Sequence, residues 1–362
     1  METFLEGDVR PLPGGGLEIE ARLFKPNSNV YLWAKSYQIG TNGLGDLDGI
    51  EQEIAAGAAR AAGVPGVVRQ RTALHENPKA RALYLQARFL LRTRGAGPHY
   101  PKAEPLFQKA IEIDPNYAKA YAGLADYFAY RVANHIVEPG TELQEGIAAA
   151  RKAMALDPNL AEAHAALGLL KFCAWDFGSA KAEYAMALRI DPNLATAYNR
   201  RALVEYAQGD FPDAEQDLLR ARDLDPLNLN EAATLIELYY YWRRYGDALR
   251  LANQVLAADP NYEYARYLEM RVRWAQGRRE EAARLARSLA ARGDENPLTL
   301  MLAGRRDWRE RLAKLHAADA SIAIYYAAAD DKKDCFRYLE RAFADRDPDL
   351  ISLRWDPVYD TI

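Results

Sequence analysis

The sequence predicts a mainly α-helical fold: a right-handed α-α superhelix of stacked helix pairs, preceded by a small antiparallel β-meander with one helix. Two observations predict it. The first is a repeated line, which runs LDPNLAEAHAALG from Leu156 and IDPNLATAYNRRA from Ile190. Five such lines place Pro115, Pro158, Pro192, Pro226 and Pro260 at separations of 43, 34, 34 and 34 residues. A fixed period in the thirties indicates stacked supersecondary units. The second is an alternating pattern in the first seventy residues.

The alternating pattern predicts three strands. In LEIEARLF, Leu17, Ile19, Ala21 and Leu23 share one face of the central strand. PGGG at 13–16 and KPNSN at 25–29 are turn signals, and TFLEGDVR and VYLWAKSYQ are the expected flanking strands. DLDGIEQEIAAGAARAAG predicts a helix with Asp46 or Asp48 as its cap. We therefore expect a small α/β domain over 1–70 and a helical array over 71–362.

The repeated line marks where helix pairs meet. A helix ends at Asp–Pro because the residue before proline avoids the helical region and proline cannot continue the ladder. The Asn or Asp beside the proline can cap the following helix. We expect helix pairs over 78–113, 116–157, 159–191, 193–225, 227–259 and 261–293. One pair has nine extra residues around 131–144, which we expect to lengthen a helix or a loop.

After residue 295 the pattern weakens. GRRDWRERLAKLHAA predicts one amphipathic helix, and IAIYYAAADDKKDCFRYLERAFADRD predicts a divergent final pair around its DDKKD turn. Charged outer residues on a terminal pair close the core of a solenoid against water.

Small and bulky residues recur at fixed places within each predicted pair. Ala103, Phe107, Ala110 and Pro115 illustrate the pattern, because small residues let antiparallel helices approach closely. This resembles the tetratricopeptide repeat. The resemblance implies that the first helices of successive pairs line an inner face, and that this face holds extended or helical peptides.

The N-terminal segments EGDVRPLPGGGLEIEARLF, YLWAKSY and DLDGIEQEIAAGAARAA resemble the second half of the TolB amino-terminal-type domain. That domain precedes tetratricopeptide repeats in bacterial winged-helix regulators, class III cyclases and some protein kinases. The phrases NPKARALYLQARFLLRTRG and YLERAFADRDPDLISLRWDPVYD resemble the first and last repeats of the same group. The resemblance implies the sensory or interaction region of a bacterial regulator, cytoplasmic, or periplasmic if the parent protein is membrane-anchored.

In that group a strand and a helix come before the glycine-rich turn, and an effector domain and membrane segment usually lie further upstream. We therefore expect this chain to be truncated or to lack its effector. A sheet shortened in this way has an unpaired edge that can accept another strand. We expect the N-terminal strands to pair between two molecules, giving a homodimer, or to lie on the first repeat.

Composition limits the classes of partner. Lys and Arg total 47 against 51 Asp and Glu, a net charge of -4. This balance offers no basic footprint, so we expect no binding of nucleic acid by this chain. The longest apolar runs are far too short for a membrane span. Cys173 and Cys335 form no CxxC pair and are expected to be small core residues.

The sequence predicts no catalysis, cofactor or metal. None of the histidines has a metal-binding spacing, and His164 falls on an expected packing site. PGGG opens no helix and no GK[ST] follows it, and no GxSxG motif is present. The histidines are His75, His99, His135, His164 and His316.

The predicted inner face supplies the candidate site, which would bind a protein or peptide ligand. Aromatic rings give contact area at low entropic cost, and Asn and Arg can hold backbone or carboxylate groups. The projected residues are Asp126, Tyr130, Asn199, Arg200, Tyr206, Glu237, Tyr240, Tyr241, Tyr264, Tyr267, Arg271 and Trp274. Many of these rings could equally pack between helices. The turn charges in WRRYGD and RWAQGRREE are expected to be solvated.

A second hypothesis is structural. The array would mediate self-association, with the inner face filled by its own tail or by a neighbouring molecule. The candidate tail is LISLRWDPVYDTI, residues 350–362, because it carries apolar residues beyond the last clear helix.

Overall fold

The computed structural model describes residues 3–12, 17–25, 31–40, 47–63, 77–92, 100–134, 140–226, 228–314, 317–360 and 362. The chain divides into two compact units. The first comprises Met1–Phe128 and Gln144–Ala163, and the second comprises Ala129–Leu143 and His164–Ile362. The predicted domain boundary at residue 70 lies outside the described residues.

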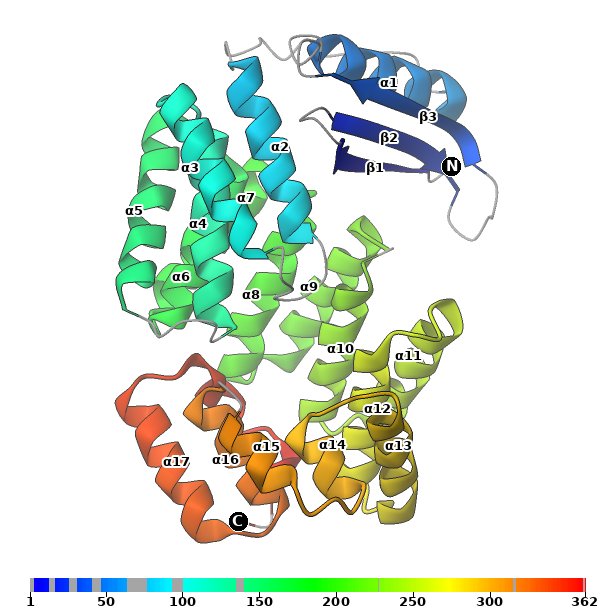
Figure 1. The fold of residues 1–362 in the computed structure, drawn as a ribbon, viewed down its shortest axis with the longest axis vertical. Helices are drawn as coiled ribbons and strands as arrows, with labels where there is room; N and C mark the ends of the chain where they lie inside the picture. Colours follow the sequence, from blue (N-terminus) through cyan, green and yellow to red (C-terminus); the bar gives the residue numbers. More distant parts are fainter. Residues whose placement is uncertain are drawn as a thin grey trace. The chain divides into compact units, whose positions relative to one another are not determined.

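The first unit contains a three-stranded antiparallel sheet in the order β1-β2-β3. Its strands are β1 (Phe4–Pro11), β2 (Leu17–Phe24) and β3 (Tyr31–Ile39), as predicted, and α1 (Leu47–Ala62) lies along one face of the sheet (Figure 1). The predicted inward residues of β2 are all buried. Leu17, Ile19 and Ile39 form a core with Ala82 of α2, so the sheet packs on the first helix pair. The predicted turn at 13–16, residues 26–29 of the second predicted turn and the capping side chains at 46 and 48 are not among the described parts.

The six predicted helix pairs are present. They are α2 (Pro78–Arg92) and α3 (Ala103–Ile113), α4 (Ala118–Ala133) and α5 (Thr141–Leu156), α6 (Ala161–Cys173) and α7 (Phe177–Ile190), α8 (Ala195–Gln208) and α9 (Phe211–Leu224), α10 (Leu229–Tyr241) and α11 (Tyr245–Ala258), and α12 (Glu263–Ala275) and α13 (Arg279–Ala291). A short 3-10 helix, η2 (Tyr100–Lys102), precedes α3. The repeat spacing and these antiparallel pairs are those of a tetratricopeptide solenoid.

The described residues after α13 form four helices and two 3-10 helices. These are α14 (Pro297–Leu302), α15 (Trp308–Lys314), α16 (Asp319–Ala328), α17 (Lys332–Ala344), η3 (Pro348–Ser352) and η4 (Pro357–Tyr359). The predicted final pair is therefore α16 and α17. The predicted amphipathic helix over 304–318 begins later than expected, at Trp308, and its described part runs to Lys314.

The extra residues around 131–144 lengthen the helices of their pair. Helices α4 and α5 each have 16 residues, against 13 and 14 for α6 and α7. Arg131 at the end of α4 donates two hydrogen bonds, of 2.7 and 2.9 Å, to the Glu142 carboxylate at the start of α5. Residues 135–139 lie outside the described residues.

The repeated aspartate closes the turn between pairs. At Asp191 the backbone is extended, because Pro192 follows, and its N–H still donates to the Ala187 carbonyl. The Asp191 carboxylate accepts a 3.0 Å hydrogen bond from the Asn193 amide. The same hydrogen bond, from the amide two residues further on, is accepted by Asp114, Asp157 and Asp259. The expectation that this residue caps the next helix is wrong here, since α8 has Leu194 at its N-cap and no side-chain cap.

Small residues allow the close approach of paired helices. Gly168 of α6 faces the buried ring of Tyr184 on α7, and a Cβ built on Gly168 would lie 2.6 Å from Tyr184 Cε1. We expect Gly168→Ala to lower the free energy of unfolding by about 1–3 kcal/mol, because the ring has no free volume into which to move.

Denaturant unfolding checks this prediction, with Gly178→Ala as the matched control. Gly178 lies in α7, and a Cβ added there would meet nothing within 4 Å. The control should be neutral or slightly stabilising because alanine favours the helix. Equal effects of the two substitutions would show that Gly168 is not a close-packing position.

Candidate peptide-binding face

Seven of the predicted inner-face residues meet on three helices of the second unit. Helix α10 contacts both α8 and α12, the first helices of the pairs before and after it. We call these seven residues the tyrosine cluster: Tyr206, Glu237, Tyr240, Tyr241, Tyr264, Tyr267 and Arg271. On α12 the three residues are spaced three and four apart, and on α10 Glu237 precedes the adjacent Tyr240 and Tyr241 by three and four residues. These spacings bring the side chains to one side of each helix.

The rings of the cluster contact one another in sequence. Tyr206 stacks on Tyr241 with ring centroids 5.7 Å apart, and Tyr241 meets Tyr240 edge-on at 5.4 Å. Tyr264 stacks on Tyr267 at 6.0 Å. Offset and edge-on ring pairs of this kind hold aromatic side chains in fixed positions. Tyr264 is 43 % exposed, so this part of the cluster is open to solvent.

Two charged groups lie among the rings. Glu237 accepts a 2.7 Å hydrogen bond from the Tyr264 hydroxyl. Burial raises the pKa of Glu237, and the Tyr264 hydrogen bond opposes that shift. The Arg271 guanidinium lies 4.6 Å from the Tyr240 ring centroid and 5.9 Å from that of Tyr267. The cluster therefore offers a cation, an acceptor and several ring faces.

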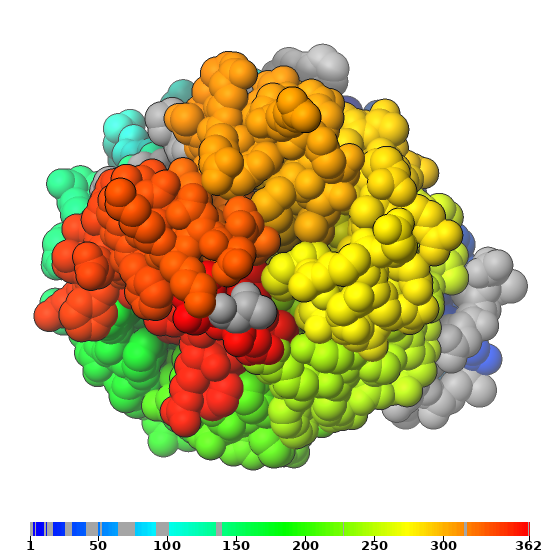
Figure 2. All heavy atoms as spheres, turned by 90° about the horizontal axis from the view of Figure 1, so that it is seen from below, coloured from blue at the N-terminus to red at the C-terminus, as the bar shows by residue number. Residues whose placement is uncertain are grey.

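Residues 355–360, which we call the 355–360 segment, lie on this cluster. The Asp356 carboxylate accepts a 2.7 Å hydrogen bond from Tyr240 and a 2.6 Å hydrogen bond from Arg271. Asp356 is 1 % exposed and Arg271 is 7 % exposed, so the ion pair is buried. Figure 2 shows the red atoms of the last residues between orange and yellow atoms on one side and green atoms on the other.

Burial works against the charge of Arg271, but Tyr240 and Asp356 raise its pKa well above the ordinary value. Burial, together with the Asp356 charge, also raises the pKa of Tyr240. Tyr240 therefore stays a hydrogen-bond donor and Arg271 stays a cation, which is the combination that holds a carboxylate.

The segment makes two further contacts. Trp355 meets the Phe211 ring edge-on at 5.0 Å, and Phe211 stacks on Trp242 at 5.7 Å. Arg243 donates two hydrogen bonds to Asp360, of 2.8 and 2.7 Å. A ring, a buried carboxylate and an exposed carboxylate of the segment are thus each held by a different group.

The other predicted residues have different surroundings. Asn199 donates to the buried Glu231 carboxylate, and burial raises the pKa of Glu231 to about 7 while this hydrogen bond opposes the shift. An Arg200 N–H lies 3.5 Å from the Ala165 carbonyl. Trp274 lies under the Arg279 guanidinium, 4.3 Å from the ring centroid.

Asp126 and Tyr130 lie one turn apart on α4 and are partly buried. A role for either residue, and for Asn199, Arg200 and Trp274, in contacting a ligand stays a prediction.

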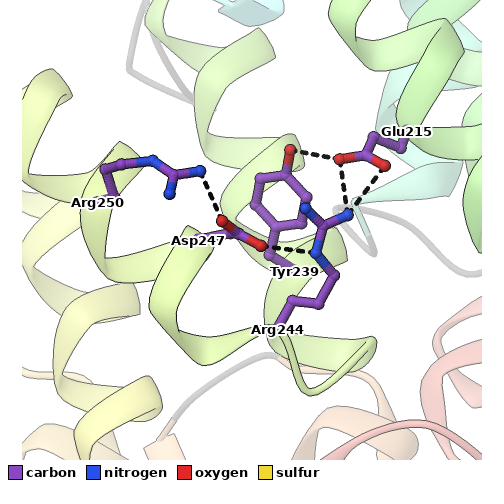
Figure 3. Close-up of polar contacts among 5 residues, drawn as sticks. All are labelled: Glu215, Tyr239, Arg244, Asp247 and Arg250. Atoms are coloured by element: carbon purple, nitrogen blue, oxygen red, sulfur yellow. Dashed lines mark hydrogen bonds and ion pairs between the residues drawn. The ribbon is translucent and has the colours of Figure 1, made fainter.

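The WRRYGD turn is not simply solvated, contrary to our expectation. Arg244 lies between two carboxylates (Figure 3): it donates to Glu215 of α9 at 2.8 and 2.9 Å and to Asp247 of α11 at 2.6 Å. The Tyr239 hydroxyl also donates to Glu215, at 2.7 Å, and Arg250 donates to Asp247. Hydrogen bonds from Arg244 and Arg250 lower the pKa of Asp247. This network ties the α10–α11 pair to α9 beside the tyrosine cluster.

A buried carboxylate lies behind the cluster on α8. Glu205 is 4 % exposed, and its Oε2 has no hydrogen-bond partner among the described residues. Its Oε1 lies 3.6 Å from Arg201 and 3.9 Å from Lys181, while Arg201 is bound to Asp217 by two 2.6 Å hydrogen bonds. Burial and then the Asp217 charge raise the pKa of Glu205 to about 7.

This raised pKa predicts a pH dependence of stability. The ordinary pKa of a glutamate is 4.5, so between pH 4.5 and 7 the folded chain keeps a proton that the unfolded chain releases. The contribution of Glu205 to the free energy of unfolding is therefore fully present below pH 4.5. It is lost as pH rises to about 7, and the loss is about 3 kcal/mol at most.

Glu205→Gln should remove this part of the pH dependence, so its gain in unfolding free energy over the unsubstituted chain should be larger at pH 8 than at pH 5. Urea titrations at both values measure it, with the exposed Glu280→Gln as control. Parallel pH profiles for the Glu205 variant and the unsubstituted chain would contradict the prediction.

Other candidate groups have packing roles. His164 is buried and its Nδ1 lies 2.7 Å from Glu183, and both cysteines are buried. Burial raises the pKa of the Cys173 thiol to about 12 and that of Cys335 to about 11. Among the described residues no three His, Cys, Asp or Glu side chains are placed to hold a metal ion. The remaining four histidines lie outside the described residues.

Within the described ranges, no helix has both the length and the apolar composition that crossing a membrane requires.

No family model and no curated protein matches this chain. Among solved structures, it resembles a monomeric mutant of IFIT1 with Gppp-AAAA at a TM-score of 0.52 and 15% identity, over 86% of this chain and 69% of that one. A thermophilic TPR protein of Thermus thermophilus gives 0.46 and 18%, over 53% and 98% of the two chains. PilF of Pseudomonas aeruginosa gives 0.45 and 18%, over 67% and 100%. At this identity the likeness concerns the fold alone.

Sequence reasoning did not identify Phe211 or Arg243 as part of this face, and it named Asp356 only as one residue of the candidate tail, 350–362. A signal for Asp356 was present, because Asp356–Pro357 repeats the Asp–Pro pair that ends the first five helix pairs. Asp356 caps η4 by accepting from the Val358 amide at 3.0 Å. Nothing in the local sequence indicates that its second oxygen meets Arg271.

Proposed function

We propose that this chain is a non-enzymatic scaffold that binds a peptide or protein segment on the tyrosine cluster. The observation that carries the proposal is that this cluster already holds a peptide segment. Tyr240 and Arg271 bind the Asp356 carboxylate, and the neighbouring Arg243 binds Asp360. These are the groups with which an extended ligand would be recognised: a cation for a carboxylate, hydroxyls for hydrogen bonds and rings for apolar contact.

The finer part of the proposal is a role in signalling. Because the N-terminal segments resemble the TolB amino-terminal-type domain of bacterial regulators, we propose that the scaffold is the sensory or interaction region of such a regulator. A peptide captured by the cluster would then be its signal or its partner.

A peptide array tests the binding proposal. The chain is labelled and incubated with the array as the unsubstituted protein, as Tyr241→Ala and as Arg200→Glu. We expect Tyr241→Ala to weaken binding at least tenfold, because Tyr241 contacts both Tyr206 and Tyr240. Phe336→Ala is the control, since Phe336 is 51 % exposed on α17. Circular dichroism shows whether each variant is folded. Unchanged binding by both Tyr241→Ala and Arg200→Glu would defeat the assignment.

Self-association is the second candidate function, and exposed aromatic residues on the last helix favour it. Phe336 and Phe343 lie two turns apart on α17 and are 51 % and 69 % exposed. Within the described sheet, the outer strands β1 and β3 each have one strand neighbour. Their other edges are where the proposed pairing between molecules would form. Light scattering over a hundredfold range of concentration tests this. A constant monomer mass would exclude it.

A further inference from the structure

We propose that the 355–360 segment is an internal ligand that regulates the tyrosine cluster, so that a partner binds by displacing it. This inference rests on the proposed function. It also defines the partner: a peptide with an aromatic residue followed directly by an aspartate, and a second acidic residue four positions further on. That pattern is Trp355, Asp356 and Asp360.

The contacts of the segment define the ligand chemistry position by position. The first aspartate is recognised by two donors, Tyr240 and Arg271, inside a site where it is 1 % exposed. A glutamine or asparagine there would leave Arg271 buried without a counter-charge. The aromatic residue meets Phe211, and the second acidic residue meets Arg243 with two parallel hydrogen bonds. The site therefore recognises both the charge and the shape of its ligand.

The segment is held at its centre by an apolar contact and by polar groups on either side, at Asp356 and Asp360. Val358 belongs to a buried cluster with Ala323, Ala327 and Cys335 of the final helix pair, and η4 contacts α16. This cluster keeps the segment near its site after release. The high local concentration of a tethered ligand makes rebinding fast and makes displacement depend on the competitor's concentration.

The polar contacts can be exchanged for water. Release of the segment breaks the Asp356–Arg271 pair and exposes both charges to solvent. Their hydration offsets most of the lost electrostatic attraction. The Arg243–Asp360 pair already has side-chain exposures of 38% and 57%. Trp355 Nε1 is buried with no hydrogen-bond partner among the described residues, and release would hydrate it. The bound segment thus keeps an indole N–H without a hydrogen-bond partner in the described part of the chain, which is a free-energy cost that a competing peptide need not have.

Competition by the chain's own sequence tests the proposal. The probe is a fluorescein-labelled synthetic peptide, ISLRWDPVYD, which copies residues 351–360. Its fluorescence anisotropy is measured with the full chain, with the double variant Asp356→Asn/Asp360→Asn, and with that variant carrying Arg271→Met as well. We expect the double variant to bind at least tenfold more tightly than the unsubstituted chain, because its site is free more of the time. Arg271→Met should abolish that gain.

Two further arms keep the test decisive. If the double variant does not fold, Asp360→Asn alone leaves the buried pair intact and should tighten binding by about 1.5- to 5-fold, the range expected for one exposed ion pair. A matched peptide with asparagine at the position of Asp356 should bind at least tenfold more weakly than the probe.

Equal probe affinity for the unsubstituted chain and the folded variants would overturn the proposal, as would no binding by any of them. If no form of the chain binds the probe but array peptides bind through Tyr241, the proposed function still stands. If no array peptide binds either, both the internal-ligand proposal and the proposed function are contradicted.

Discussion

Asp356→Ala is expected to lower the free energy of unfolding by about 3–5 kcal/mol, the range for leaving one partner of a buried ion pair uncompensated. The carboxylate accepts from Arg271, from Tyr240 and from the Val358 amide, and it is 1 % exposed. Its removal leaves a buried guanidinium and a buried hydroxyl without their acceptor. Denaturant unfolding followed by circular dichroism measures the loss.

Two further variants separate the buried pair from its surroundings. Asp360→Ala removes a half-exposed carboxylate of the same segment, so its cost should stay within about 1 kcal/mol. Asp356→Leu combined with Arg271→Met removes both charges and should recover most of the loss. A loss below about 1 kcal/mol for Asp356→Ala would mean that Arg271 is already hydrated in the folded chain.

Phe211→Ala should cost about 3–5 kcal/mol, the usual range for truncating a buried phenylalanine. Phe211 begins α9, stacks on Trp242 after α10 and meets Trp355 edge-on. Its truncation removes a ring that two tryptophans contact from different sides. We also expect the tryptophan emission to shift to longer wavelength, because both indoles gain contact with water.

Phe336→Ala is the control for this substitution. The same side chain is removed from a position that is 51 % exposed, so the change should stay within about 0.5 kcal/mol and leave the emission unchanged. Similar losses at both positions would contradict the view that Phe211 joins the segment to the helix pairs.

The helix pairs could be predicted from the sequence because their signals are local. Asp191–Pro192 ends a helix through the backbone preference before proline, and Gly168 marks close packing within one pair. The alternation in LEIEARLF likewise determined which side of β2 is buried. Each of these rules acts within a few residues or between adjacent helices.

The grouping of the tyrosines could be predicted only in part, because it depends on rotation between pairs. Tyr240 and Arg271 are 116 and 85 residues from Asp356 along the chain. Small rotations accumulate from pair to pair in a solenoid, and they determine which distant residues meet. The Asn199 amide binds Glu231, a contact that no repeat pattern specifies.

Amide hydrogen exchange, with and without a peptide selected on the array, tests the central claim most directly. The amides of Val358, Tyr359 and Asp360 are hydrogen-bonded within the segment. Binding at the tyrosine cluster should slow exchange along α10 and α12 and speed exchange at residues 358–360. A peptide that binds tightly yet leaves both regions unchanged would show that its site lies elsewhere on the chain.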